Sequence, residues 1–60
     1  MFKVGDRVRK EKVMKVQNAV GTIQNIPKEY VVVLWDEVKG QWHYTHEQAQ
    51  MKLEILDESG

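Results

Sequence analysis

The 60-residue sequence contains no cysteine, one proline and one serine, and it has no long apolar run. Without cysteine the chain has neither a disulfide nor a thiolate metal site, which favours an intracellular, reducing location. No apolar stretch approaches the roughly 20 residues that span a bilayer, and residues 1–6 lack the apolar core of a signal peptide. We therefore expect a cytoplasmic protein with no membrane partner.

Residues that carry out catalysis are equally scarce. The only serine is Ser59, near the end, and neither Thr22 nor Thr45 has a base placed beside it by the sequence. Residues 43–47 hold two histidines and a glutamate, but not at the spacing of a metalloprotease helix. The four glycines occur singly, so phosphate-binding and dinucleotide-binding loops are excluded. We predict that the protein is not an enzyme and needs no metal or cofactor.

The length permits one small domain. A chain of this size buries only about 60% of the surface that its unfolded form exposes. The ordering entropy, about 1.5 kcal/mol per residue, offsets nearly all of the resulting gain. We expect one domain over residues 1–57, with residues 58–60 as a frayed tail.

Charge is balanced overall but separated along the sequence. The nine basic and nine acidic residues cancel, yet residues 1–28 hold seven basic against two acidic residues, and residues 29–60 hold the reverse. The first part therefore has a net charge of +5 and the second a net charge of −5. This asymmetry indicates either a basic binding stripe or neighbouring strands that neutralise each other. We favour neutralisation, in exposed pairs that contribute under about 1 kcal/mol each.

The first half of the chain is expected to hold two strands. Charge and valine alternate over residues 6–9, with Phe2 and Val4 leading in, and period-two spacing returns over residues 19–26 before Pro27 ends it. Residues 10–18 are charged and lack a helical stripe, so they are predicted to form a loop.

The second half is expected to hold three more strands. Residues 30–36 give the strongest strand pattern, because valine is repeated and flanked by aromatic residues. Further strands are predicted at 41–45, after a turn at Gly40, and at 51–56. Residues 45–50 are expected to form one helical turn, since Thr45 and Gln48 have the spacing of a capping box.

Short strands at roughly ten-residue spacing predict a small, strongly bent all-β barrel. Four segments resemble SH3-like barrels, and their order is most similar to the PsaE group of electron-transport accessory proteins: Val4–Val8, Val20–Ile23, Val31–Asp36 and Leu53–Leu56. The Trp35-Asp36 pair, followed by Tyr44 and the closing segment Leu53–Leu56, is also similar to the barrel domain of mind-bomb-type ubiquitin ligases. Gly5–Val8 and Gly21–Ile23 resemble the KOW motif, without the glycines of its intervening loop. The resemblance implies a five-stranded SH3-like barrel with one short helical turn before the last strand, and it specifies fold more than function.

Alternation predicts which residues form the core. Along residues 30–36, Val31, Val33 and Trp35 are expected to point inward, and Tyr30, Val32 and Leu34 outward. Trp35 and Tyr44 are expected to be structural. The expected core is Val8, Ile23, Val31, Val33, Trp35, Leu53 and Ile55.

These features favour a non-catalytic binding module, a small protein-interaction or assembly-accessory protein. The surface expected to contact a protein partner has two parts. One part supplies apolar contacts, with Trp42 at the rim: Tyr30, Val32, Leu34 and His43. The other lies in residues 10–18 and beside them, and supplies adaptable charge with Met14 as a flexible apolar tip: Arg9, Lys10, Lys12 and Lys15. A row as apolar as Tyr30, Val32 and Leu34 is a liability when exposed. Either a second copy of the chain covers it in a homodimer, or residues 10–18 fold back over it with Val13, Met14 and Val16.

Nucleic-acid binding is the alternative function. The basic residues that would contact phosphate are Arg7, Arg9, Lys10, Lys12, Lys15 and Lys28. Trp42 or Tyr30 would stack on a base. The zero net charge of the whole chain counts against this function.

Overall fold

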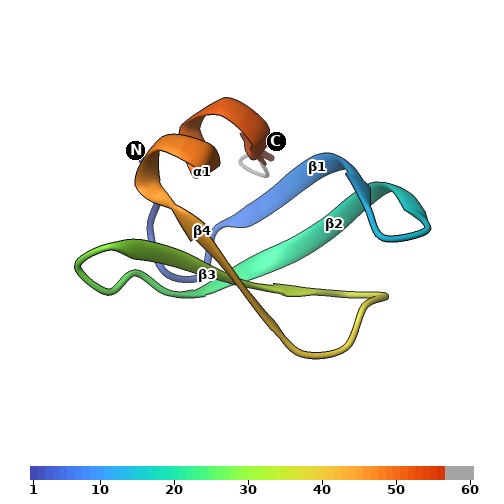
Figure 1. Cartoon of the computed structure of the whole chain (residues 1–60), viewed down its shortest axis with the longest axis horizontal. Helices are drawn as coiled ribbons and strands as arrows, with labels where there is room; N and C mark the ends of the chain where they lie inside the picture. The colour runs from blue at the N-terminus through green and yellow to red at the C-terminus, as the bar shows by residue number, and fades with distance from the viewer. Residues whose placement is uncertain (57–60) are drawn as a thin grey trace.

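The computed structural model describes residues 1–56, which form one five-stranded antiparallel sheet and one short helix (Figure 1). The elements are, in chain order, β1 (Arg7–Val13), β2 (Val16–Asn25), β3 (Tyr30–Trp35), β4 (Gln41–Thr45), α1 (His46–Lys52) and β5 (Glu54–Ile55). The strand order across the sheet is β4-β3-β2-β1-β5, so only β5 returns to a strand distant in sequence. The tail expected at residues 58–60 lies outside the described residues.

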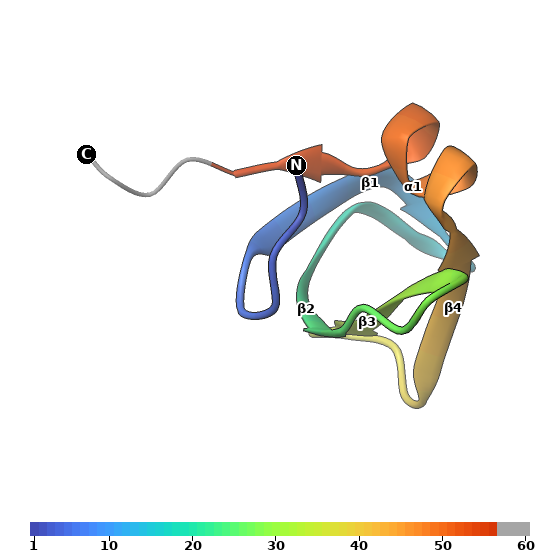
Figure 2. The same cartoon turned by 90° about the vertical axis from the view of Figure 1, so that its left-hand side faces the viewer.

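The sheet is strongly curved but is not closed into a barrel. Figure 2 shows β1 to β4 bending around a common interior, with α1 above it. The edge strands β4 and β5 are not paired with each other, and β5 pairs only with Val8 and Arg9 of β1. The expected all-β class and five strands are therefore confirmed, whereas the strands do not form a closed barrel.

The prediction that residues 10–18 form a loop is wrong. Strands β1 and β2 continue through this segment and leave only Met14 and Lys15 as the turn. The buried positions Val8 and Val13 are an odd number of residues apart, so the inward-facing positions change parity along β1. Asn18 on β2 has a positive φ of 53° in the same part of the hairpin. This irregularity removes the period-two pattern by which a strand is recognised in sequence.

Helix α1 begins with the predicted capping box. The Thr45 hydroxyl accepts a hydrogen bond from the Gln48 backbone N–H, and the Gln48 side-chain oxygen accepts one from the Thr45 N–H, each at 3.1 Å. The helix is longer than the expected single turn and extends to Lys52, so β5 is restricted to Glu54–Ile55. Ala49 is fully buried and anchors α1 on the core.

The core lies inside the curve of the sheet and contains most of the residues expected there. Its buried members are Val8, Val13, Ala19, Ile23, Val31, Val33, Trp35, Ala49 and Leu53. Ile55, which was also expected, is 42% exposed. It lies on a two-residue edge strand, where no further strand among residues 1–56 covers it.

Trp35 and Tyr44 have the structural role predicted for them. Their rings meet edge to face, with centroids 6.3 Å apart, and Trp35 Nε1 donates a hydrogen bond of 3.2 Å to the Tyr44 hydroxyl. Burial raises the pKa of Tyr44, partly opposed by this hydrogen bond. The pair therefore joins β3 and β4 from within the core.

Among residues 1–56, the structure contains no helix with the length and apolar character needed to cross a bilayer.

Candidate functional site

The face of the sheet that points away from the core is the candidate site, and we call it the outer face. Directly opposite residues on antiparallel strands share a face. The register places Arg7, Thr22, Leu34 and Gln41 in one row across β1 to β4. Val32 and His43 form a second row on β3 and β4, and Tyr30 lies opposite Thr45 in a third. The sheet therefore brings Tyr30, Val32, Leu34 and His43 onto one surface, as predicted.

The exposed apolar groups of the outer face lie on either side of a covered one. Tyr30 is 40% exposed and Leu34 is 38% exposed, whereas Val32 between them is only 5% exposed. The Tyr30 ring meets the His43 imidazole edge to face, with centroids 5.8 Å apart. The expectation that Val32 is an exposed contact is thus wrong: it points outward, but neighbouring side chains cover it.

A shallow hollow of about 350 Å³ lies over Val32. Its walls are polar apart from one proline: Gln24, Asn25, Pro27, Gln41 and His43. The Gln41 side-chain amide donates a 2.9 Å hydrogen bond to the Gln24 side-chain oxygen, a bond that leaves the Gln24 amide hydrogens and the Gln41 oxygen for other partners. A bulge in β2 between Ile23 and Asn25 shifts the pairing beside this hollow. No local sequence pattern indicates the hollow, because the sheet register creates it.

Two of the predicted partner-binding residues lie elsewhere. Trp42 is on the inner side of β4, packs against the core and donates through Nε1 to the Lys39 carbonyl at 3.4 Å. Met14 is 67% exposed in the β1–β2 turn, at the opposite end of the sheet from the β2–β3 turn that precedes Tyr30 (Figure 1). These two residues therefore do not share a surface with Tyr30.

The hairpin of β1 and β2 does not cover the outer face. Val13 belongs to the buried core, and Val16 packs against that core from the same side. Met14, the third residue expected to fold over Leu34, is exposed. The alternative in which residues 10–18 cover the apolar row is thus wrong, because the segment is a strand pair within the sheet.

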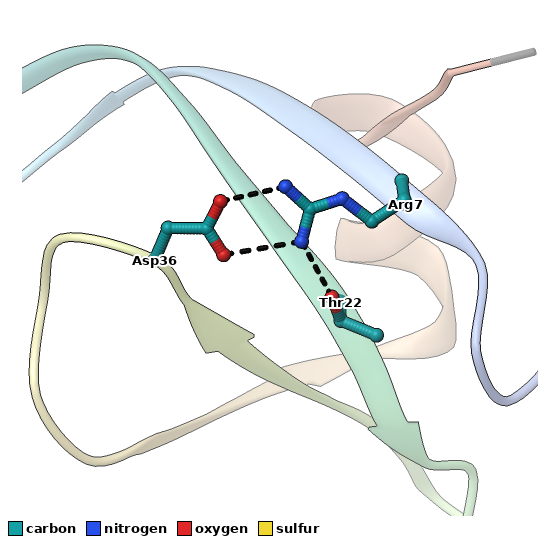
Figure 3. Close-up of polar contacts among 3 residues, drawn as sticks. All are labelled: Arg7, Thr22 and Asp36. Carbon is teal, nitrogen blue, oxygen red and sulfur yellow. Dashed lines mark hydrogen bonds and ion pairs between the residues drawn. The ribbon is translucent and has the colours of Figure 1, made fainter. Parts of the chain in front are cut away.

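Arg7 of β1 forms a network with Thr22 of β2 and with Asp36, in the turn that follows β3 (Figure 3). Its guanidinium contacts both Asp36 carboxylate oxygens, at 2.6 and 3.1 Å, and donates a 2.7 Å bond to the Thr22 hydroxyl. The hydrogen bond from Arg7 holds the pKa of Asp36 below its usual value. A residue of the basic first half is here neutralised by one of the acidic second half.

Arg9 is neutralised in the same way. Its guanidinium forms an ion pair of 2.8 Å with Glu54 on β5, and it donates a 2.7 Å bond to the Asn18 side-chain oxygen. For Arg7 and Arg9 the preferred interpretation of the charge asymmetry, mutual neutralisation across the fold, is therefore confirmed.

The predicted phosphate contacts do not gather in one patch. Lys15 lies in the β1–β2 turn, and Lys28 lies in the β2–β3 turn at the other end of the sheet (Figure 1). Lys10 and Lys12 lie on β1, where the Lys10 ammonium donates a 2.6 Å bond to the Lys12 backbone carbonyl. Of these four lysines, Lys10 and Lys12 are the two that lie on one strand.

A second and larger hollow, of about 780 Å³, was not foreseen from the sequence. It lies beside α1 and is lined mainly by apolar residues: Met1, Phe2, Ile26, His46, Gln50, Leu53 and Ile55. Its lining comes from segments far apart in the chain, so only the tertiary structure reveals it. Ile55, which was expected in the core but is exposed, is part of this lining.

The two histidines do not form a metal site with the neighbouring carboxylates. His43 lies on the outer face, whereas His46 begins α1 and places Nε2 3.1 Å from the Lys28 carbonyl oxygen. Within residues 1–56 no group of three or more His, Asp and Glu side chains is arranged to hold a metal ion. The outer face offers rings, amides and aliphatic carbon, which are groups suited to binding.

Comparison of the chain with protein-family models, with curated proteins and with solved structures found no match.

Proposed function

We propose that this chain is a non-catalytic protein-interaction module whose outer face binds a protein partner. We also propose that its fold is an open variant of the SH3-like barrel. Support for the fold comes from the five antiparallel strands, the strong curvature of the sheet and the short helix before the last strand.

One observation carries the functional proposal. Two large hydrophobic side chains, Tyr30 and Leu34, are more than one third exposed on the same face, on either side of a hollow whose floor is Val32. Exposed aromatic and aliphatic groups beside polar rim groups are typical of protein contact surfaces. Gln24 and Gln41 supply the amide groups of that rim.

The charge arrangement favours a protein over a nucleic acid as the partner. Arg7 and Arg9 are held in ion pairs with Asp36 and Glu54, so phosphate would have to displace a carboxylate at each of them. Exposed lysines alone supply weak, salt-sensitive attraction. Nucleic-acid binding is accordingly the less favoured function.

The proposal is tested by affinity capture with matched charge variants. Leu34→Glu places a carboxylate in the proposed contact, whereas Val4→Glu makes the same change at a residue that is 61% exposed in the N-terminal segment. We expect wild type and Val4→Glu to capture the same protein partner, and Leu34→Glu to lose it. Circular dichroism establishes that each variant is folded, and Tyr30→Ser replaces Leu34→Glu if the latter unfolds.

Sedimentation at several protein concentrations identifies a partner that is a second copy. A homodimer through the outer face would be isologous, would dissociate on dilution and would become a monomer in Leu34→Glu. Equal capture by Leu34→Glu and wild type, together with unchanged sedimentation, would contradict the proposal.

A further inference from the structure

The edge of β1 is only partly paired. Strand β5 lies beside β1 at Val8 and Arg9, and the Leu56 N–H bonds the Arg7 carbonyl. Among residues 1–56, β2 is the one strand paired with the remainder of β1, Lys10–Val13, and no strand lies on the other side of that segment (Figure 2). An unpaired strand edge is a template for another strand. This edge is separate from the outer face proposed above as a contact surface.

A groove of about 600 Å³ runs between this part of β1 and the junction of α1 with β5. From β1 it is lined by Lys10 and Lys12, and from the junction by Met51, Lys52 and Leu53. Met51 is 77% exposed. A flexible thioether of this kind adapts to an apolar side chain laid against it.

The charges around this groove favour an acidic ligand. Arg9 and Glu54 are paired with each other at its end. That pairing leaves three lysines (Lys10, Lys12, Lys52) against Glu11 along the rest of the lining. In the part of the chain that the structure describes, neither Lys12 nor Lys52 forms an ion pair.

Beside this groove a side chain of β1 is hydrogen-bonded to a backbone carbonyl of the same strand. The Lys12 carbonyl accepts its 2.6 Å hydrogen bond from the Lys10 ammonium. A peptide N–H that replaced this ammonium would keep the carbonyl satisfied and would release the ammonium to pair with a carboxylate. Strand addition and recognition of acidic residues therefore support each other at this position.

We propose that the open edge of β1 binds an extended acidic peptide of a partner protein as an added strand. Acidic residues of that peptide pair with Lys10, Lys12 and Lys52. Apolar residues, which alternate with the acidic ones along an extended chain, contact Met51. The open backbone edge favours a peptide over a nucleic acid, because ionised phosphate groups cannot donate hydrogen bonds to its carbonyl groups.

The test uses a synthetic peptide with three Glu-Val repeats and blocked ends, titrated into the full chain by isothermal titration calorimetry. A control peptide of the same sequence carries N-methyl groups on every residue, which keep its charge but remove the N–H groups that strand pairing needs. We expect methylation to weaken binding at least tenfold. We expect amide chemical-shift changes to concentrate at residues 10–13 and 51–53.

Charge variants locate the site. Lys12→Glu and Lys52→Glu come from different elements, so at least one folded variant reports on the groove if the other unfolds. Each is expected to weaken peptide binding at least tenfold, whereas Lys28→Glu, which makes the same charge change in the β2–β3 turn, leaves it within twofold.

Three results would overturn the proposal. Equal binding of the methylated peptide would show that charge acts without strand addition. Shift changes confined to Tyr30, Leu34 and their neighbours would place the peptide on the outer face. A single-stranded oligonucleotide of equal charge that bound more tightly at residues 10–13 would identify the groove as a phosphate site.

Discussion

Gly21 on β2 lies directly opposite Trp35 on β3, and the indole occupies the space that a side chain at position 21 would need. A Cβ atom there would approach the Leu34 carbonyl oxygen to 2.6 Å and Trp35 Cε3 to 2.8 Å. Neither the backbone nor the buried ring can withdraw easily, because Trp35 is also held by Tyr44. The glycine thus permits the tryptophan to enter the core.

Gly21→Ala is expected to destabilise the domain by about 1–3 kcal/mol, the range for overpacked cores. Urea unfolding followed by tryptophan fluorescence measures the loss. Gln17→Ala, at an exposed position of the same strand, is the control and should change stability by less than about 0.5 kcal/mol. Equal urea midpoints for the two variants would show that the sheet yields to the added methyl group.

Tyr44→Phe is expected to cost about 1–3 kcal/mol, because it leaves the buried Trp35 N–H without its acceptor. It should also change the response to alkali. Since burial raises the pKa of Tyr44 above 10.0, its contribution is fully present below pH 10.0 and is lost as the pH rises through the folded-state value.

Thermal melts between about pH 8 and pH 12 measure this part of the prediction. The wild type is expected to lose stability in alkali more steeply than Tyr44→Phe. Parallel curves would mean that the tyrosine does not contribute to alkaline unfolding.

Asp36→Asn is expected to reduce the sensitivity of the fold to acid. The hydrogen bond from Arg7 lowers the pKa of Asp36 from 3.8, so its contribution is present above pH 3.8 and is lost as the pH falls through the lower folded-state value. Melting temperatures between about pH 5 and pH 2 should fall more steeply for wild type than for Asp36→Asn. Arg7→Gln should remove the same part of the acid dependence, and an acid response identical in all three proteins would refute this assignment.

Thr45→Ala is expected to destabilise the domain by about 1 kcal/mol, the usual cost of losing an N-terminal helix cap. The reason is that the Gln48 N–H loses its acceptor in the capping box. Thr45→Ser keeps the hydroxyl and should retain most of the stability in the same urea titration. A serine variant as unstable as the alanine variant would assign the loss to the threonine methyl group instead.

Sequence patterns predicted well where one local rule decided the structure. The alternation of residues 30–36 identified the inward positions Val31, Val33 and Trp35, and the spacing of Thr45 and Gln48 identified the start of α1. In both cases neighbouring residues along the chain carry the whole signal.

The failures arise where pairing across the sheet decides the structure. The change of parity near Asn18 hid two strand segments, and the two-residue length of β5 left Ile55 exposed. Val32 is covered by side chains such as His43, which the register brings over it. Both hollows and the open edge of β1 depend on the same cross-strand relations, so only part of the candidate site was accessible from the sequence.

The return of β5 to β1 also sets an order of events during folding. Strands β1 to β4 pair with their neighbours in sequence, whereas the Arg9–Glu54 contact joins residues 45 positions apart. Bringing these distant residues together costs conformational entropy, and the two-residue pairing of β5 with β1 offsets little of that cost. We therefore expect strands β1 to β4 to form first and β5 to dock last. In native-state hydrogen exchange, the Leu56 amide, which donates to the Arg7 carbonyl, should therefore open at a lower free energy than the Ile23 amide bonded to Asp6.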